Sequence, residues 1–263
     1  MYAQVNGIRM HYSVDGPIDA PVVTLVTGIA NDVTMWDGQV KALAGNYRVL
    51  RYDLRGQGKS ESTPGPYSIA SLGDDLIALL NALKIQKTHL VGLGLGSCVA
   101  MQVAIKDPQR LISLIPCCCR AKMVPDFDAM WQKLSDTVGA GGIEPIVEQT
   151  AQRWFSDDFK AANPEVIDRV RAMIRITSKE GYLGVVAAFR GLDLEDQLKN
   201  INTPALFVGG AEDRIGGPAD IMQGIAAKVP GASYEPVPGA AHIANLQNEA
   251  GFNAIIKAFL DAH

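Results

Sequence analysis

The sequence predicts an α/β protein with a mostly parallel, doubly wound sheet and an inserted helical segment. Short apolar runs alternate with stretches of helical periodicity through most of the chain, which is typical of parallel strands joined by helices. From about residue 121 to 190 there is no strand-like run, only helical pieces broken by prolines and glycines. We therefore expect a core formed by residues 1–120 and 191–263, with a helical cap at 121–190.

The individual elements follow from local patterns. Two strands at 2–5 and 8–12 flank Asn6-Gly7, a strong hairpin signal. The continuous apolar run at 21–26 is typical of a buried parallel strand. Similar reasoning predicts further strands at 47–53, 88–93, 111–117, 204–209 and 233–237, and helices at 69–83, 96–106, 217–229 and 246–261.

Composition narrows the possible partners. The 263 residues are 48% hydrophobic and 20% charged, and the net charge of −4 gives no electrostatic reason to expect nucleic acid. No apolar run approaches the roughly 20 residues that span a bilayer. The N-terminus lacks the basic flank and apolar stretch of a signal peptide. We expect a cytoplasmic protein that acts on a small molecule, and the oligomeric state stays open.

One short stretch raises the question of chemistry. Residues 92–96 read Gly-Leu-Gly-Leu-Gly, which keeps both glycines of the frame G-x-S-x-G, a strand-turn-helix elbow that exposes a nucleophilic serine. Gly94 occupies the place of that serine and has no side chain to attack a substrate. The stretch also resembles a dinucleotide fingerprint, but Ser97 takes the place of the third glycine and no acidic residue ends a strand about 20 residues on. We expect neither a nucleotide cofactor nor a metal.

Four loops are expected to meet at one edge of the sheet, because parallel sheets place their chemistry at the carboxyl ends of their strands. They hold Thr27-Gly28-Ile29, the turn at Gly94, Asp213 and His242. Taken alone, Asp213 could simply cap or pair within a loop, and His242 could be a structural histidine without a catalytic role. Their order along the chain, a nucleophile position followed by an acid and a histidine, is that of a hydrolase triad.

At these residues the sequence resembles α/β-hydrolase fold proteins over nearly its whole length. Within that superfamily it is similar to the 3-oxoadipate enol-lactonase group, whose members carry a helical cap. The stretches that carry the resemblance are N-D-V-T-M-W-D at 31–37, Y-D-L-R-G-Q-G-K-S at 52–60, G-L-G-L-G-S at 92–97, G-A-E-D at 210–213 and P-G-A-A-H-I-A-N at 238–245.

The resemblance implies a role for each site residue. His242 would be the general base, and Asp213 would hold its tautomer and stabilise the imidazolium. The backbone N–H groups of Ile29 and Leu95 would form the oxyanion hole. Gly94 stands where relatives have the nucleophilic serine, so covalent catalysis is lost.

Three functions stay open for such a site. The first is a lactone or carboxylic-ester hydrolase of the Ser-His-Asp type whose nucleophile is absent, as in an engineered inactive variant. The second is a natural enzyme that uses only the dyad of His242 and Asp213, such as a cofactor-independent oxygenase or a lyase. The third is a non-catalytic ligand-binding protein. The retained acid and base favour the first function over the third.

Cysteines and arginines leave two further alternatives. Cys98 is expected in the core, whereas strand alternation points one or two of the cysteines at 117–119 toward something else, either a strained vicinal disulfide or a thiol near the site. One arginine in or beside the cap would bind a substrate carboxylate, and the candidates are Arg120, Arg153, Arg175 and Arg190.

Overall fold

A single sheet organises the chain. The computed structural model describes all residues from Met1 to His263. Its eight strands lie in the order β1-β2-β4-β3-β5-β6-β7-β8. Their bounds are β1 (Tyr2–Val5), β2 (Ile8–Asp15), β3 (Val22–Val26), β4 (Arg48–Tyr52), β5 (Thr88–Leu93), β6 (Leu111–Cys117), β7 (Leu206–Gly210) and β8 (Ser233–Val237). The strands from β4 to β8 pair in parallel, and β1 and β2 form the antiparallel start, so the predicted fold class is confirmed.

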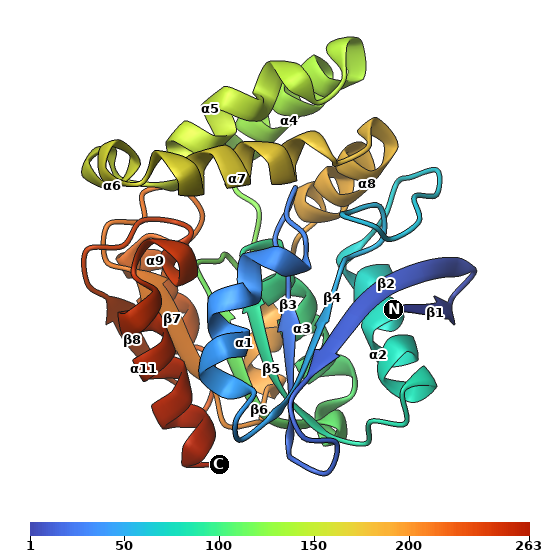
Figure 1. Cartoon of the computed structure of the whole chain (residues 1–263), viewed down its shortest axis with the longest axis vertical. Coiled ribbons are helices and arrows are strands. Elements are labelled where there is room, and N and C mark those ends of the chain that lie inside the picture. The colour runs from blue at the N-terminus through green and yellow to red at the C-terminus, as the bar shows by residue number, and fades with distance from the viewer.

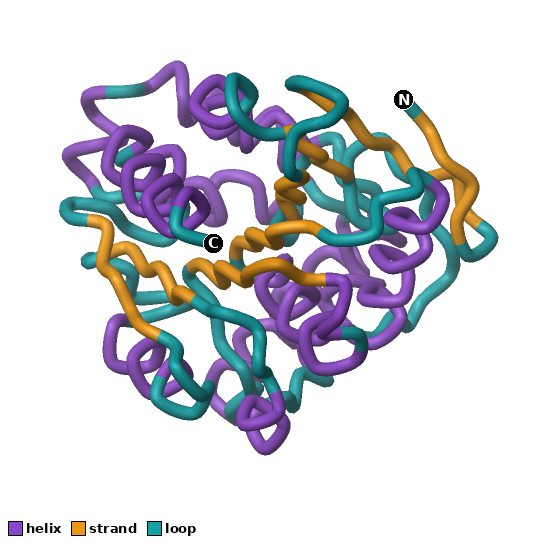
Figure 2. Tube along the Cα trace, turned by 90° about the horizontal axis from the view of Figure 1, so that it is seen from below, coloured by secondary structure: helices purple, strands orange, loops and turns teal.

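Helices cover both faces of the sheet, which Figure 2 shows edge-on between two helical layers. They are α1 (Asp37–Leu43), α2 (Ile69–Ala82), α3 (Leu95–Lys106), α9 (Ala219–Ala226), α10 (Ala244–Gln247) and α11 (Glu249–Asp261), with short 3-10 turns η1 (Val33–Trp36), η2 (Pro108–Arg110) and η3 (Glu195–Asn200).

Local sequence explains these elements. Every residue of β5 is buried, as expected for a parallel strand covered on both faces, and its two polar side chains, Thr88 and His89, hydrogen-bond to Thr24 at 2.9 Å and Ser113 at 2.8 Å. Helix α2 begins with a capping box in which the Ser68 and Ser71 side chains each accept from the other's backbone N–H. The single helix predicted over 246–261 is wrong. The chain leaves α10 at Asn248, whose side chain then accepts from the N–H of Gly251 at 2.9 Å and caps α11.

Five helices lie between β6 and β7 in the chain and gather above the sheet (Figure 1). We call them the helical segment: α4 (Pro125–Gly141), α5 (Glu144–Trp154), α6 (Asp157–Ala162), α7 (Pro164–Arg175) and α8 (Lys179–Arg190). Pro125, Pro145 and Pro164 each stand in a first helical turn, where no backbone N–H is needed. Gly142, with φ of 73°, ends α4.

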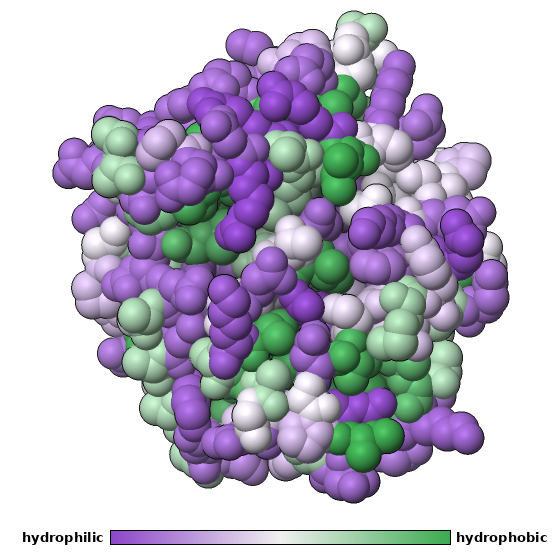
Figure 3. Space-filling view, in the orientation of Figure 1, coloured by the Kyte–Doolittle hydropathy of each residue, from purple (hydrophilic) through white to green (hydrophobic).

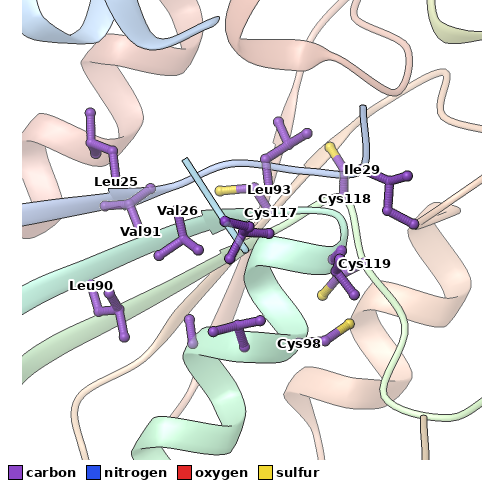
Figure 4. Packing of buried hydrophobic residues seen from close by; sticks show 14 of the residues in the cluster. Leu25, Val26, Ile29, Leu90, Val91, Leu93, Cys98, Cys117, Cys118 and Cys119 are labelled. Atoms are coloured by element: carbon purple, nitrogen blue, oxygen red, sulfur yellow. The ribbon is translucent and has the colours of Figure 1, made fainter. Parts of the chain in front are cut away.

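The surface and the interior divide as expected for a globular chain. The face seen in Figure 3 is mostly hydrophilic, with small separated apolar areas. No helix is long and apolar enough to cross a membrane. Figure 4 shows Cys98 of α3 near Cys119, which follows β6. All four cysteines are buried and free, so no vicinal disulfide forms.

Candidate active site

Gly94 forms a sharp turn between β5 and α3. Its φ of 56° and ψ of −118° lie in a region that L side chains rarely adopt. The flanking glycines allow strand and helix to approach. A Cβ on Gly92 would lie 2.4 Å from the carbonyl oxygen of Gly96, and a Cβ on Gly96 would lie 2.4 Å from that of Val26. The elbow expected from the sequence is therefore present, with glycine at its centre.

The space beside Gly94 is open toward one side chain. A Cβ at this position would meet only the Nε2 atom of His242 within 4 Å, at 3.9 Å. Ser97 offers the next hydroxyl along the chain, but its Oγ lies 2.8 Å from the carbonyl oxygen of Gly92 and 2.9 Å from that of Cys117. This buried hydroxyl ties α3 to the sheet and does not face the open space.

A histidine and a carboxylate come together from two loops. Asp213 follows β7, His242 follows β8, and His242 Nδ1 lies 2.9 Å from Asp213 Oδ2. The carboxylate is fully buried and also accepts from the N–H groups of Ile215 at 2.8 Å and Gly217 at 2.8 Å. Burial pushes the pKa of Asp213 up, but the charge of His242 and these hydrogen bonds outweigh it, so the pKa lies below its ordinary value.

A close backbone approach holds the imidazole in place. A Cβ on Gly216 would lie 2.1 Å from Cε1 of His242, so only glycine lets this loop pack against the ring. Because Asp213 accepts at Nδ1, the ring presents Nε2 to the space beside Gly94.

Two residues that line the same region, Ile29 and Leu95, have backbone N–H groups without a partner in the protein. The N–H of Ile29 has no acceptor within the protein, and Leu95 begins α3, where the first N–H groups have no intrahelical partner. The Ile29 loop is fixed by Gln57, whose Oε1 accepts from the N–H of Ala30 at 2.7 Å. Gln57 belongs to the 53–60 loop, so this loop supports the site without entering it.

These groups line a cavity of about 500 Å³ of empty space, its open mouth included. The floor comes from the strand ends and carries Ile29, Gly94, Leu95 and His242. The roof comes from α4, α5 and α8 of the helical segment and is mostly aromatic: Phe127, Trp131, Arg153, Trp154 and Phe189. A mainly apolar cavity with few polar groups is typical of a small-molecule site.

One of the two alternatives for the cysteines at 117–119 was a thiol near the site, and Cys118 is the cysteine that lies beside the dyad. The ligand atoms of Cys118, Asp213 and His242 all lie within 4.8 Å of one another, and such a set has the chemistry to hold a metal. The Nδ1 to Oδ2 hydrogen bond already occupies two of these groups. Burial and the nearby Asp213 charge raise the pKa of the Cys118 thiol well above its ordinary value, which makes it a poor ligand and a poor nucleophile.

Comparison with known proteins decides the family. The alpha/beta hydrolase fold family model matches residues 21–249. The chain belongs to the α/β hydrolase family. Within it, 3-oxoadipate enol-lactonase 2 of Acinetobacter baylyi is 30% identical over 253 residues, which cover 96% of this chain and 93% of the relative.

Two further α/β hydrolase relatives span almost the same length. A putative carbamate hydrolase, RutD, of Stutzerimonas stutzeri is 29% identical over 94% of this chain and 95% of its own. The crystal structure of the enol-lactonase from Burkholderia xenovorans LB400 superposes with a TM-score of 0.95 at 32% identity, covering 99% of this chain and 100% of that one. The resemblance inferred from the sequence motifs is therefore confirmed.

Proposed function

We propose that this protein is a hydrolase of small lactones or carboxylic esters, built on the Ser-His-Asp plan with the nucleophile missing at Gly94. The observation that carries the proposal is the relation between Gly94 and His242. The imidazole Nε2 is the one heavy atom within 4 Å of a Cβ at position 94, and a serine Oγ on that Cβ would come within hydrogen-bond reach of it. The names of the relatives, enol-lactonase and carbamate hydrolase, support hydrolysis of small molecules.

The remaining groups would each act on a nucleophile at this position. Nε2 of His242 would take the proton while the nucleophile's oxygen bonds to the carbonyl carbon, and it would return that proton to the leaving oxygen as the acyl C–O bond breaks. Asp213 would hold the Nδ1 proton and stabilise the imidazolium. The N–H groups of Ile29 and Leu95 would bind the carbonyl oxygen as it becomes negative.

With Gly94 in place, we expect hydrolysis to be absent or strongly impaired. Water beside Nε2 would be the only oxygen nucleophile, and it would lack the fixed position of a serine hydroxyl. Loss of a triad nucleophile lowers turnover by about a millionfold, which leaves only what binding and the oxyanion hole provide.

We further propose that residues 121–190 act as a cap and that residues 1–120 and 191–263 form the hydrolase core. The five helices of the segment are contiguous in the chain, and their aromatic side chains roof the cavity. The cap would exclude water from the acyl group and select substrates by size.

A second candidate function rests on the same dyad without a serine. Nε2 of His242 faces open space, so it has access to a weakly acidic C–H of a bound ligand, and Ile29 and Leu95 would hold the resulting enolate. This dyad-only hypothesis predicts that the enzyme turns over substrate with Gly94 in place and that His242→Ala abolishes turnover.

A paired assay separates these functions. The natural chain, Gly94→Ser and Gly94→Ala would be offered lactones and short aryl esters, with stopped-flow detection of a burst and intact-mass detection of an acyl adduct. We expect Gly94→Ser to gain at least about a thousandfold in kcat/KM and to form the adduct. The alanine variant adds the Cβ without the hydroxyl, so its kcat/KM should not rise and no acyl adduct should form. Equal rates in all three proteins would refute the hydrolase proposal and leave the dyad chemistry.

A further inference from the structure

Arg153 of α5 is the one cap arginine that lines the cavity. It also borders a polar cleft beside it, and His242 lines both hollows. One of its terminal nitrogens lies 3.2 Å from the sulfur of Met130, and its buried Nε has no acceptor. No carboxylate lies within salt-bridge distance of Arg153: of the two acidic residues that line the cleft, Asp157 pairs with Lys160 at 2.7 Å, and Glu212 forms no ion pair with Arg153. Burial lowers the pKa of the Arg153 guanidinium because no carboxylate offsets the loss of water.

The other three arginines are already engaged. Arg175 and Arg190 each bind a carboxylate of the helical segment, with closest N–O distances of 3.0 Å and 2.6 Å. The guanidinium of Arg120 lies 4.5 Å from the centre of an aromatic ring and donates to a backbone carbonyl. Of the four candidates, Arg153 is the one left without an anionic or carbonyl acceptor.

A second donor without an acceptor lines the same cavity. The buried Nε1 of Trp131, on α4, has no partner. An indole N–H and a guanidinium can only donate, and buried donors are normally paired. Two unpaired donors from residues that line one mostly apolar cavity favour an anionic ligand there, and a planar carboxylate matches the fork of a guanidinium.

We propose that Arg153, assisted by the indole N–H of Trp131, forms a carboxylate-binding subsite that determines which ligands this cavity takes. This inference rests on the proposed function, which supplies the lactone or ester that makes up the remainder of the ligand. The carboxylate has two possible sources: a free carboxylate elsewhere on the lactone or ester, or the carboxylate that hydrolysis of any ester releases. In the first case Arg153 selects the substrate, and in the second it holds the product.

Binding can be measured without turnover, by isothermal calorimetry on the natural chain. The probes are two matched pairs: 5-oxotetrahydrofuran-2-carboxylate with its carboxamide, and butyrate with butyramide. The variants are Arg153→Met, Arg153→Lys and Trp131→Phe. Arg175→Met is the control, because that arginine belongs to the same segment and binds a surface carboxylate.

We expect the natural chain and the control to bind at least one carboxylate at least tenfold more tightly than its amide. Arg153→Met should abolish the preference, Arg153→Lys should retain part of it, and Trp131→Phe should weaken it. A preference confined to the lactone acid identifies a substrate group, whereas a preference for butyrate identifies the product. Equal binding of acid and amide by the natural chain, or a preference that survives in Arg153→Met at unchanged strength, would overturn the proposal. A carboxylate preference without any gain of hydrolysis in Gly94→Ser would leave this subsite standing and remove the hydrolase function.

Discussion

The elbow glycine is expected to stabilise the fold, and replacing it with alanine tests this directly. A glycine-to-alanine change lowers the conformational entropy of the unfolded chain. This stabilises the folded state by about 0.4–1 kcal/mol where the native backbone conformation suits alanine. At Gly94 the backbone does not suit alanine, because φ is 56° and ψ is −118°. Holding a side chain in such a conformation costs about 1–3 kcal/mol.

Sterics add little to that cost. The new Cβ would meet only Nε2 of His242, at 3.9 Å, which is ordinary van der Waals contact. The net effect of Gly94→Ala is then a loss of about 0–2.6 kcal/mol, centred near 1.3 kcal/mol, in the free energy of unfolding. For a chain of this size, such a loss lowers Tm by up to roughly 10 °C.

Two other glycines provide matched controls for thermal and urea unfolding. In Gly96→Ala the Cβ would lie 2.4 Å and 2.6 Å from two backbone carbonyl oxygens, so we expect a loss of about 3 kcal/mol or more. In Gly139→Ala, within α4, the Cβ meets nothing within 4 Å, and helix propensity predicts a gain of about 0.5 kcal/mol. A Gly94→Ala protein as stable as Gly139→Ala would refute the assignment of strain to the elbow.

Three more predictions concern buried charges and thiols. Arg55 binds the buried carboxylate of Asp75 through two 2.7 Å hydrogen bonds, so Arg55→Met should cost about 3–5 kcal/mol in urea unfolding, and adding Asp75→Leu should recover part of it. Because the pKa of Asp213 is lowered in the folded state, the ionised carboxylate should stabilise the fold fully above about pH 4 and less as the pH falls below it. The difference in free energy of unfolding between the natural chain and Asp213→Asn should therefore shrink at low pH. A difference that stays constant from about pH 7 to about pH 3 would contradict this. The four buried thiols, whose pKa values are all raised, should resist a disulfide reagent at pH 8 within minutes and react fully in denaturant; rapid reaction in the native protein would contradict their burial.

Much of the fold was predictable because most of its parallel strands are short runs rich in apolar residues that alternate with helical patterns. The parallel strands appear close to their predicted positions, and His242 and Asp213 meet as their places after two strands implied. The short helix α1 was missed, since seven residues carry too little periodicity to identify a helix. The division at Asn248 was missed because a side-chain cap within an apolar pattern does not interrupt the pattern.

The parts of the site that sequence did not reveal depend on contacts between distant elements. That Arg175 and Arg190 are engaged by carboxylates and Arg120 by a backbone carbonyl, which leaves Arg153 free, follows only from the positions of those partners in the fold. The support that Gln57 gives to the Ile29 loop joins residues 27 positions apart through a single hydrogen bond. Which of the three cysteines at 117–119 lies near the dyad depends on the sheet order, which places β7 beside β6.

In the elbow, the residues that shape the backbone are different from the residue that would carry a reactive group. Gly92 and Gly96 admit no side chain, and Ser97 fastens the start of α3 to the sheet, so none of these positions can vary without moving the backbone. Position 94 alone is free of neighbours except the imidazole it would serve. A change in one codon can therefore add or remove a reactive group at modest cost in stability, while the machinery around it stays assembled. Under the proposed function, a lineage could lose or regain hydrolysis by substitution at this one position without changes elsewhere in the protein.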